Sequence, residues 1–600
     1  MKIHAIFAFL LLFAGTHGFA AESRASYQQL IDNPDHLSDA QRLQKLFQID
    51  WERGIRESPE FATDLGYPGF DDRWTDMSQA AIDERKQENQ WPLDVLNSIH
   101  PDTLPVPDKL NYDLFRYNVE EAIADAKFPG EFMAVNQLGG VQQSIPQTVR
   151  DMPHGTVKQY ENILSRLHAA PRLIDQNIAL MKRGLAAGVT MPKIVLRNVP
   201  DQVLKVIPDD PMASALLKPF TDFPPAMGDA DRARLKAEAI KAYREDLTPA
   251  YHQLHDFLVH DYIPNVREAI AWAALPCGAN WYRLMVHSHT TTDMTPAEIH
   301  DLGLREVKRI HGEMENVAAS SGFNGDYNAF LNFMRTDPRF YYTDPQSLLS
   351  GFRDIAKQID PILPGFFHKL PRLTYGVRAI PDYAAESAPA AYYQGGSVAA
   401  GRPGWFCANT SNLASRPKWQ MQVLTLHESV PGHHLQISLA QEMENVPEFR
   451  KYNGYTAYTE GWALYCERLG EEMGFYKDPY AKFGELTFEM WRACRLVVDT
   501  GIHAQGWSRQ QAIDYMMTNA GKDEHEATVE IDRYIASPGQ ALAYKIGQLK
   551  ILALRDEAAR TLGDKFDLRS FHDALLANGS LPLPVLQAQM NAWINTQKKP

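Results

Sequence analysis

The sequence predicts a mainly α-helical protein with a small β-sheet, arranged as two lobes around a cleft. Three observations support this fold class. Helical patterns with explicit start signals dominate the chain, and strand-like segments are few. All the motifs with recognisable chemistry fall in the second half. The 600 residues, 44% of them hydrophobic, are enough to bury a large core.

The first 21 residues predict a secretory signal peptide. Lys2 precedes an apolar run at residues 5–14, and small residues follow as far as Ala20 and Ala21, where we expect cleavage. The run is too short to span a bilayer, and no other stretch is long and apolar enough to do so. No cysteine lies near this segment. We therefore expect an exported chain, periplasmic or secreted, with no membrane span and no lipid anchor.

The mature chain is predicted to divide into two parts. Residues 22–285 are expected to form an N-terminal helical lobe, which has proline-rich breaks at 101–108 and 207–225 but no chemical motif. Residues 286–600 are expected to form a C-terminal catalytic lobe that carries the metal site.

Helix starts and strands can be located from local signals. Residues 295–298 form a capping box with proline at the first helical position, which predicts a helix start. Residues 508–511 and 537–540 predict helix starts by similar capping signals. Residues 193–196 and 404–410 are the best strand candidates. The second of these is interpreted as an edge strand available to pair with an extended peptide backbone.

Charge and cysteine content exclude several classes of protein. The net charge is −14 and no basic cluster occurs, which argues against binding to nucleic acid or to anionic membrane surfaces. The four cysteines are too few for a disulfide scaffold, so free thiols are expected.

The most informative motif spans residues 427–434. His427 and Glu428 open it, and two further histidines, His433 and His434, close it. Imidazole and carboxylate are ligands of catalytic zinc, and a glutamate beside the first histidine is the usual water-activating base. A second ligand normally follows four residues after the first, but Pro431 occupies that position. We expect a helix over 417–443 with a bulge at the Pro-Gly pair that brings His433 within reach, with His434 as the alternative.

A second helix, from about Tyr458 to Met473, is expected to supply the third ligand. Glu460 lies near its start, where an antiparallel return places it beside His427. Glu467 follows on the same face. It either holds a ligand histidine through the second ring nitrogen or forms an ordinary salt bridge.

Candidates for stabilising an oxyanion come from later in the chain. Arg495, Asp499 and His503 recur at every fourth position of an apolar helix, where they either line the cleft or form a core network. Tyr534 and Tyr544 flank the predicted helix start at 537. A zinc peptidase needs a hydrogen-bond donor for its oxyanion, and Tyr544, Tyr534 or His503 is predicted to serve.

Several segments together resemble the bacterial family known as domain of unknown function 885. The matching segments are residues 282–300, 427–434, 460–465, 495–503 and 537–547. That family is placed among gluzincin-like zinc metallopeptidases, similar to the thimet oligopeptidase, carboxypeptidase Taq and angiotensin-converting enzyme groups. The resemblance implies a helical, clam-like molecule with a deep central cleft. It also implies metal ligands at His427, at His433 or His434, and at Glu460, with Glu428 as base. It does not name a substrate.

These observations lead to one functional hypothesis and several alternatives. The hypothesis is an exported zinc-dependent peptidase that hydrolyses short peptides, with Glu428 activating a water held by the metal. One alternative is another metal-dependent amidase or cell-wall peptide hydrolase. A second is a non-catalytic, metal-stabilised peptide-binding protein. A third concerns the ion alone, because two histidines and a carboxylate also suit iron(II).

Overall fold

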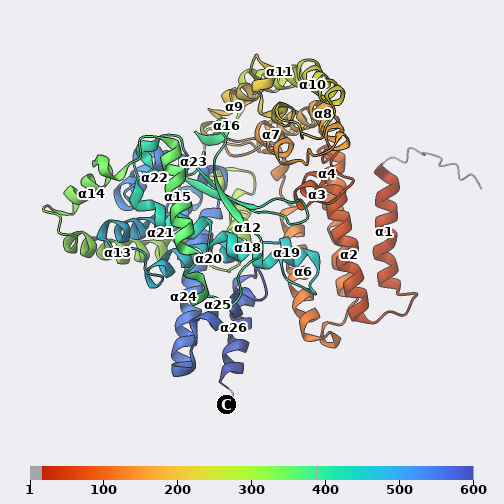
Figure 1. Ribbon diagram of the computed structural model, residues 1–600. Coiled ribbons are helices and arrows are strands. Elements are labelled where there is room, and N and C mark those ends of the chain that lie inside the picture. Colours follow the sequence, from red (N-terminus) through yellow and green to blue (C-terminus); the bar gives the residue numbers. More distant parts are fainter. Residues whose placement is uncertain (1–15, 387, 599–600) are drawn as a thin grey trace, which may run out of the picture.

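The computed structural model describes residues 16–386 and 388–598, and it is mainly helical with one three-stranded mixed sheet (Figure 1). The predicted fold class is therefore confirmed at this level. The apolar run of the predicted signal peptide, residues 5–14, lies outside the described residues. Among the described helices, none is both long and apolar enough to cross a membrane.

The first half of the chain contains helices α1 to α12. Their bounds are α1 Thr16–Asp32, α2 Asp39–Glu57, α3 Pro59–Leu65, α4 Gln79–Glu88, α5 Gln90–Asn97, α6 Val106–Asp125, α7 Val141–Asp151, α8 Val157–Ala187, α9 Val199–Val206, α10 Asp229–Ala242, α11 Thr248–Asp256 and α12 Gly278–Thr290.

The second half contains helices α13 to α26. Their bounds are α13 Pro296–Ser320, α14 Tyr327–Thr336, α15 Pro345–Ile359, α16 Asp382–Ala385, α17 Met421–Glu428, α18 His433–Gln441, α19 Glu448–Tyr452, α20 Thr456–Glu472, α21 Pro479–Gln505, α22 Arg509–Ala520, α23 Glu524–Ala536, α24 Ala543–Leu562, α25 Leu568–Leu576 and α26 Leu583–Gln597.

One large hydrophobic core runs through both halves. It includes side chains from Ile82 to Ile594 and therefore crosses the predicted boundary near residue 285. A smaller core joins α1, α2, α5 and α6, which lie together in red and orange in Figure 1. Helices α10 and α11 both pack against α8 at the top of that view.

The sheet corrects two strand predictions. Its strands are β1 (Tyr375–Ala379), β2 (Ala391–Gln394) and β3 (Gly404–Ala408), in the order β1-β3-β2, with β3 parallel to β1 and antiparallel to β2. The strand at 404–408 is thus central rather than an edge, because neighbours on both sides use its backbone groups. The predicted strand at 193–196 is wrong, since Lys193–Leu196 forms a short 3-10 helix.

The capping predictions are confirmed at two of three places. Thr295 and Ser508 each form a full capping box at the start of α13 and α22. Ser537 instead follows the last residue of α23. The chain then turns at Gly539, whose φ is +78°, and enters a short 3-10 helix before α24.

Two helix pairs position the residues discussed below. Helix α13 packs along α21, which is buried over most of its 27 residues. Helix α20 packs closely on α24 through Gly461 and Gly547: a Cβ atom on Gly461 would lie 2.4 Å from the Gly547 carbonyl carbon. Only glycine allows this approach, which holds the start of α20 against the start of α24.

Candidate metal centre

The predicted single helix over 417–443 is wrong, because the chain forms two helices there. Helix α17 ends at Glu428 and α18 begins at His433. The four residues between them turn tightly against the end of α17. A Cβ atom on Gly432 would lie 2.0 Å from the His427 carbonyl oxygen, so the turn requires glycine. As a result, the rings of His427 and His433 contact each other. Their centroids are 4.7 Å apart and their planes are perpendicular.

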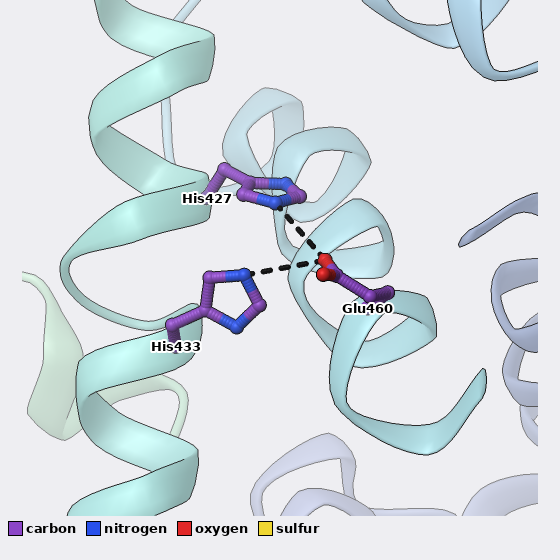
Figure 2. Close-up of side chains that lie close together, drawn as sticks. All are labelled: His427, His433 and Glu460. Atoms are coloured by element: carbon purple, nitrogen blue, oxygen red, sulfur yellow. Dashed lines mark ion pairs between the residues drawn. The ribbon is translucent and has the colours of Figure 1, made fainter. Parts of the chain in front are cut away.

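His427 and His433, both buried, and the partly buried Glu460 form a cluster of possible metal ligands (Figure 2). One ligand atom from each lies within 4.8 Å of the others. The Glu460 Oε2 atom is 3.5 Å from Nε2 of His427 and 3.3 Å from Nε2 of His433. Ligands about 2.0–2.2 Å from a tetrahedral zinc ion are separated by roughly 3.3–3.5 Å. The cluster therefore fits a single ion.

The chemistry of the three groups also fits a cation. Oε2 of Glu460 is buried and has no hydrogen-bond partner among the described residues. A buried carboxylate oxygen facing two imidazole nitrogens needs either protons or a metal ion between them. Despite burial, the two histidines hold the pKa of Glu460 well below its ordinary value. This carboxylate is therefore ionised and ready to bind a cation.

His434 lies outside the cluster. Its Nε2 donates a hydrogen bond to the Leu373 carbonyl oxygen at 2.9 Å, and its Nδ1 accepts one from the Tyr393 hydroxyl at 2.9 Å. Burial lowers the pKa of His434 to about 4, so its ring is neutral. Of the two alternatives for the second ligand, the structure places His433 in the cluster.

Glu467 lies between His427 and Arg492. Its carboxylate lies 2.7 Å from Nδ1 of His427 and 2.9 Å from Nη2 of Arg492. Burial lowers the pKa of His427, but the carboxylates of Glu460 and Glu467 outweigh burial and raise it to about 9. Glu467 thus directs the Nε2 face of His427 toward Glu460, as an outer carboxylate does in many zinc sites.

A cavity of about 300 Å³ opens beside the cluster. The three possible ligands and Glu428 all line it. Glu428 is buried, and burial raises its pKa. Within the described part of the chain, one of its carboxylate oxygens has no hydrogen-bond partner. Other lining residues include Tyr393, Ile437, Thr459, Trp491, Arg492, Arg495, Glu530, Arg533 and Tyr544.

Tyr544 is the predicted oxyanion donor that lines this cavity. Its ring lies parallel to that of His427 with centroids 6.2 Å apart. Its hydroxyl accepts a hydrogen bond from Gln540 at 3.3 Å, which leaves the hydroxyl proton available to another group.

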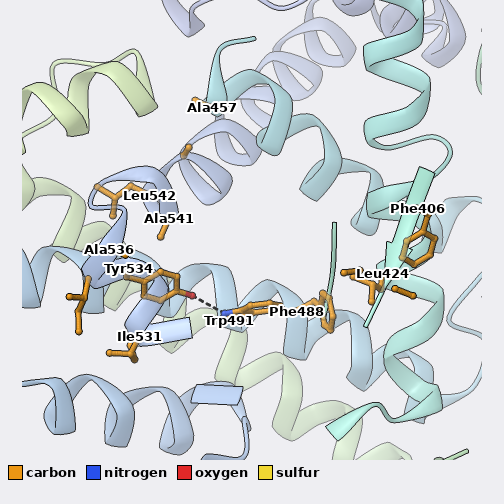
Figure 3. Close-up of a cluster of buried hydrophobic side chains, with 14 of the residues drawn as sticks. Phe406, Leu424, Ala457, Phe488, Trp491, Ile531, Tyr534, Ala536, Ala541 and Leu542 are labelled. Atoms are coloured by element: carbon orange, nitrogen blue, oxygen red, sulfur yellow. Dashed lines mark hydrogen bonds between the residues drawn. The ribbon is translucent and has the colours of Figure 1, made fainter. Parts of the chain in front are cut away.

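The other two predicted donors are engaged elsewhere. The Tyr534 hydroxyl donates to Glu530 at 2.8 Å and accepts from Trp491 at 3.0 Å, a contact within the buried cluster of Figure 3. His503 accepts a hydrogen bond from the Trp272 backbone and donates one to the Tyr534 carbonyl oxygen. Both side chains are buried within the core.

The predicted polar series on α21 divides into two parts. Asp499 accepts hydrogen bonds from the Tyr282 hydroxyl at 2.7 Å and the Gly539 amide at 3.1 Å, and so belongs to a core network with His503 nearby. Arg495 lines the cavity. Arg492 and Arg533, which also line it, were missed in the sequence. For Arg492 the available signal was its spacing of three residues from Arg495 on the same helix.

The chain is similar to known proteins in sequence and in fold. The chain is similar to the crystal structure of a "putative lipoprotein" from Colwellia psychrerythraea, with 28% sequence identity, a TM-score of 0.87, and coverage of 93% of this chain and 100% of the other. A "putative lipoprotein of unknown function" from Shewanella oneidensis shares the fold at 19% identity and a TM-score of 0.66, over 92% of this chain and 99% of the other. A comparison with curated proteins finds no match. The family described as "Bacterial protein of unknown function (DUF885)" matches residues 59–590, and the chain therefore belongs to that family.

Proposed function

We propose that this protein is an exported zinc-dependent peptidase that hydrolyses short peptides. One observation carries the proposal: a His-His-Glu cluster suited to a single ion shares a cavity with a buried glutamate from the same helix end. A structural metal site is normally closed by four protein ligands, whereas a catalytic site has three and leaves a position open.

His427, His433 and Glu460 would hold the ion, and the cavity supplies the open position. Zinc bound there supplies Lewis acidity that favours ionisation of a water and polarises the scissile carbonyl. Glu428 accepts a proton from the water while the water oxygen attacks the carbonyl carbon. Glu428 then donates that proton to the leaving amine. The Tyr544 hydroxyl donates a hydrogen bond to the carbonyl oxygen as it gains negative charge.

The size of the neighbouring spaces favours short peptides as substrates. The cavity at the cluster shares Ile437 and Thr459 with an adjoining cavity of about 370 Å³. That second cavity shares Tyr452 and Asn453 with a third of about 500 Å³. Spaces of this size accommodate an extended peptide but not a folded domain.

The test combines metal content with turnover. We would purify the mature chain, determine its metals by elemental analysis, and follow cleavage of a dipeptide and oligopeptide library before and after chelation. We expect one zinc per chain, loss of cleavage on chelation, and recovery on adding zinc. Iron in place of zinc would change the ion but keep the site. Zinc-loaded protein that cleaves no peptide bond would overturn the proposal.

A further inference from the structure

We propose, on the basis of the peptidase function above, that three arginines in the cavity bind the C-terminal carboxylate of the substrate. The protein would then release residues from the C-terminal end of a peptide. Arg492 and Arg495 come from α21 and Arg533 from α23, and all three line the cavity that contains the metal cluster.

The arginines outnumber the carboxylates with which they form ion pairs. Arg495 and Arg533 share a single carboxylate, that of Glu530, each at 3.2 Å. Arg492 pairs with Glu467 at 2.9 Å, but Glu467 also holds His427. Three guanidinium groups thus rely on two carboxylates, one of which is committed to a metal ligand.

Two of the three guanidinium groups also retain a nitrogen without a hydrogen-bond acceptor among the described residues. These atoms are Nη1 of Arg495 and Nε of Arg492, which are buried and have no hydrogen-bond partner in the part of the chain that the structure describes. Both side chains are only 3% exposed, so bulk water does not satisfy them. Arginine recognises carboxylates through paired N–H groups. A buried guanidinium that lacks acceptors is stabilised when an anion binds to it.

Aromatic rings fix the position of the arginine cluster. The guanidinium carbon of Arg495 lies 4.3 Å from the Trp491 ring centre and 4.2 Å from that of Tyr544. Arg492 lies 4.5 Å from Trp491. Stacking of this kind holds the charges in place before a ligand arrives, which reduces the ordering cost of binding.

The cavities indicate that the peptide chain must end at the arginines. Beyond Trp491 and Glu530 the space shrinks to a cavity of about 20 Å³, whose walls include Arg416 and Glu526. Such a volume holds about one water molecule and no residue. On the side of Ile437 and Thr459, by contrast, the cavity continues into the larger spaces described above. An extended peptide therefore enters from that side and places its last carboxylate at the arginines.

The reaction is ordinary hydrolysis at the bond next to this carboxylate. The C–N bond of the peptide breaks and a C–O bond forms from the attacking water. Glu428 transfers the proton of that water to the leaving amine, which is the new N-terminus of the released C-terminal residue.

A matched pair of peptides tests the inference without altering the protein. N-acetyl-trialanine and its C-terminal amide differ only in the negative charge at the end. We would measure their cleavage by the zinc-loaded protein and their binding to zinc-loaded Glu428→Gln by calorimetry. We expect cleavage at the last peptide bond. We also expect the acid to be preferred by about ten- to a hundred-fold, which corresponds to the contribution of one charge-assisted hydrogen bond to binding. Equal use of both peptides would overturn the inference.

Variants assign the preference to the arginines. Arg533 is the most exposed of the three, so Arg533→Gln is the variant best placed to fold. We expect it to reduce the preference for the acid, Arg533→Lys to retain part of it, and the control Arg555→Gln, which removes a pair with Glu472, to leave it unchanged. An unchanged preference in folded Arg533→Gln and in Arg495→Lys would overturn the assignment.

The binding measurement separates this inference from the proposed function. If neither peptide is cleaved but the acid binds more tightly than the amide, the peptidase proposal fails while the carboxylate site stands. If both peptides are cleaved at internal bonds with equal rates, the peptidase proposal stands while the carboxylate site fails.

Discussion

The carboxylate of Glu428 lies in the cavity at the end of α17, one residue after the first possible metal ligand, yet it is not one of the clustered ligand atoms. Its proposed role is to move a proton. Glu428→Gln preserves size and hydrogen bonding but removes the base. We expect kcat to fall by about 100- to 10,000-fold, while zinc content stays at the wild-type level. Peptide turnover with parallel elemental analysis checks this, and near-normal turnover would contradict the mechanism.

Glu467 acts through His427 rather than on the substrate. Its carboxylate holds Nδ1 of His427 and is itself held by Arg492. For Glu467→Gln we expect zinc affinity to fall about ten- to a hundred-fold, because outer carboxylates orient ligand histidines. Competition with a fluorescent zinc chelator measures the affinity. The matched control is Glu472→Gln. Glu472 lies on the same helix as Glu467 and forms an ion pair with Arg555 at the surface. An equal loss in both variants would contradict the assigned role.

At the scale of elements, the contact between α20 and α24 fixes the position of Glu460, which precedes Gly461 on α20. Gly461→Ala places a methyl group 2.4 Å from the Gly547 backbone, so the helices must separate. We expect a loss of about 1–3 kcal/mol in the free energy of unfolding, together with weaker zinc binding. Denaturant unfolding and zinc titration measure the two effects.

Helix α13 provides the control for this change. Gly312 has open space around its Cα atom. Gly312→Ala should raise stability by up to about 1 kcal/mol through helix propensity and leave zinc affinity unchanged. If Gly461→Ala behaves in the same way as Gly312→Ala, the helix contact does not position the ligand.

For the whole molecule, stability should depend on the protonation of a buried carboxylate. Burial raises the pKa of Asp499 from 3.8 to about 7. The folded state therefore binds this proton more tightly than the unfolded state. The stability that results is fully present below the ordinary pKa and is lost as pH rises through about 7. Asp499→Asn cannot titrate, so its stability relative to wild type should improve as pH rises from about 5 to about 8.

Chemical unfolding at a series of pH values tests this prediction. Asp354→Asn, at an exposed position on α15, serves as the control and should follow the wild-type pH profile. A constant difference between Asp499→Asn and wild type across the range would show that Asp499 stays ionised or is not buried in solution.

The sequence by itself determined the features that depend on local chemistry. The helical class, the capping boxes at Thr295 and Ser508 and the helix carrying Glu460 followed from short-range periodicity and capping. The choice of His427, His433 and Glu460 as candidate ligands followed from side-chain type and spacing.

Only the tertiary structure decided the features that depend on distant contacts. The central place of β3 depends on which strands flank it. The arginine cluster joins α21 to α23, more than thirty residues apart. No local pattern encodes such pairings, because they arise when separate elements bury their surfaces against one another.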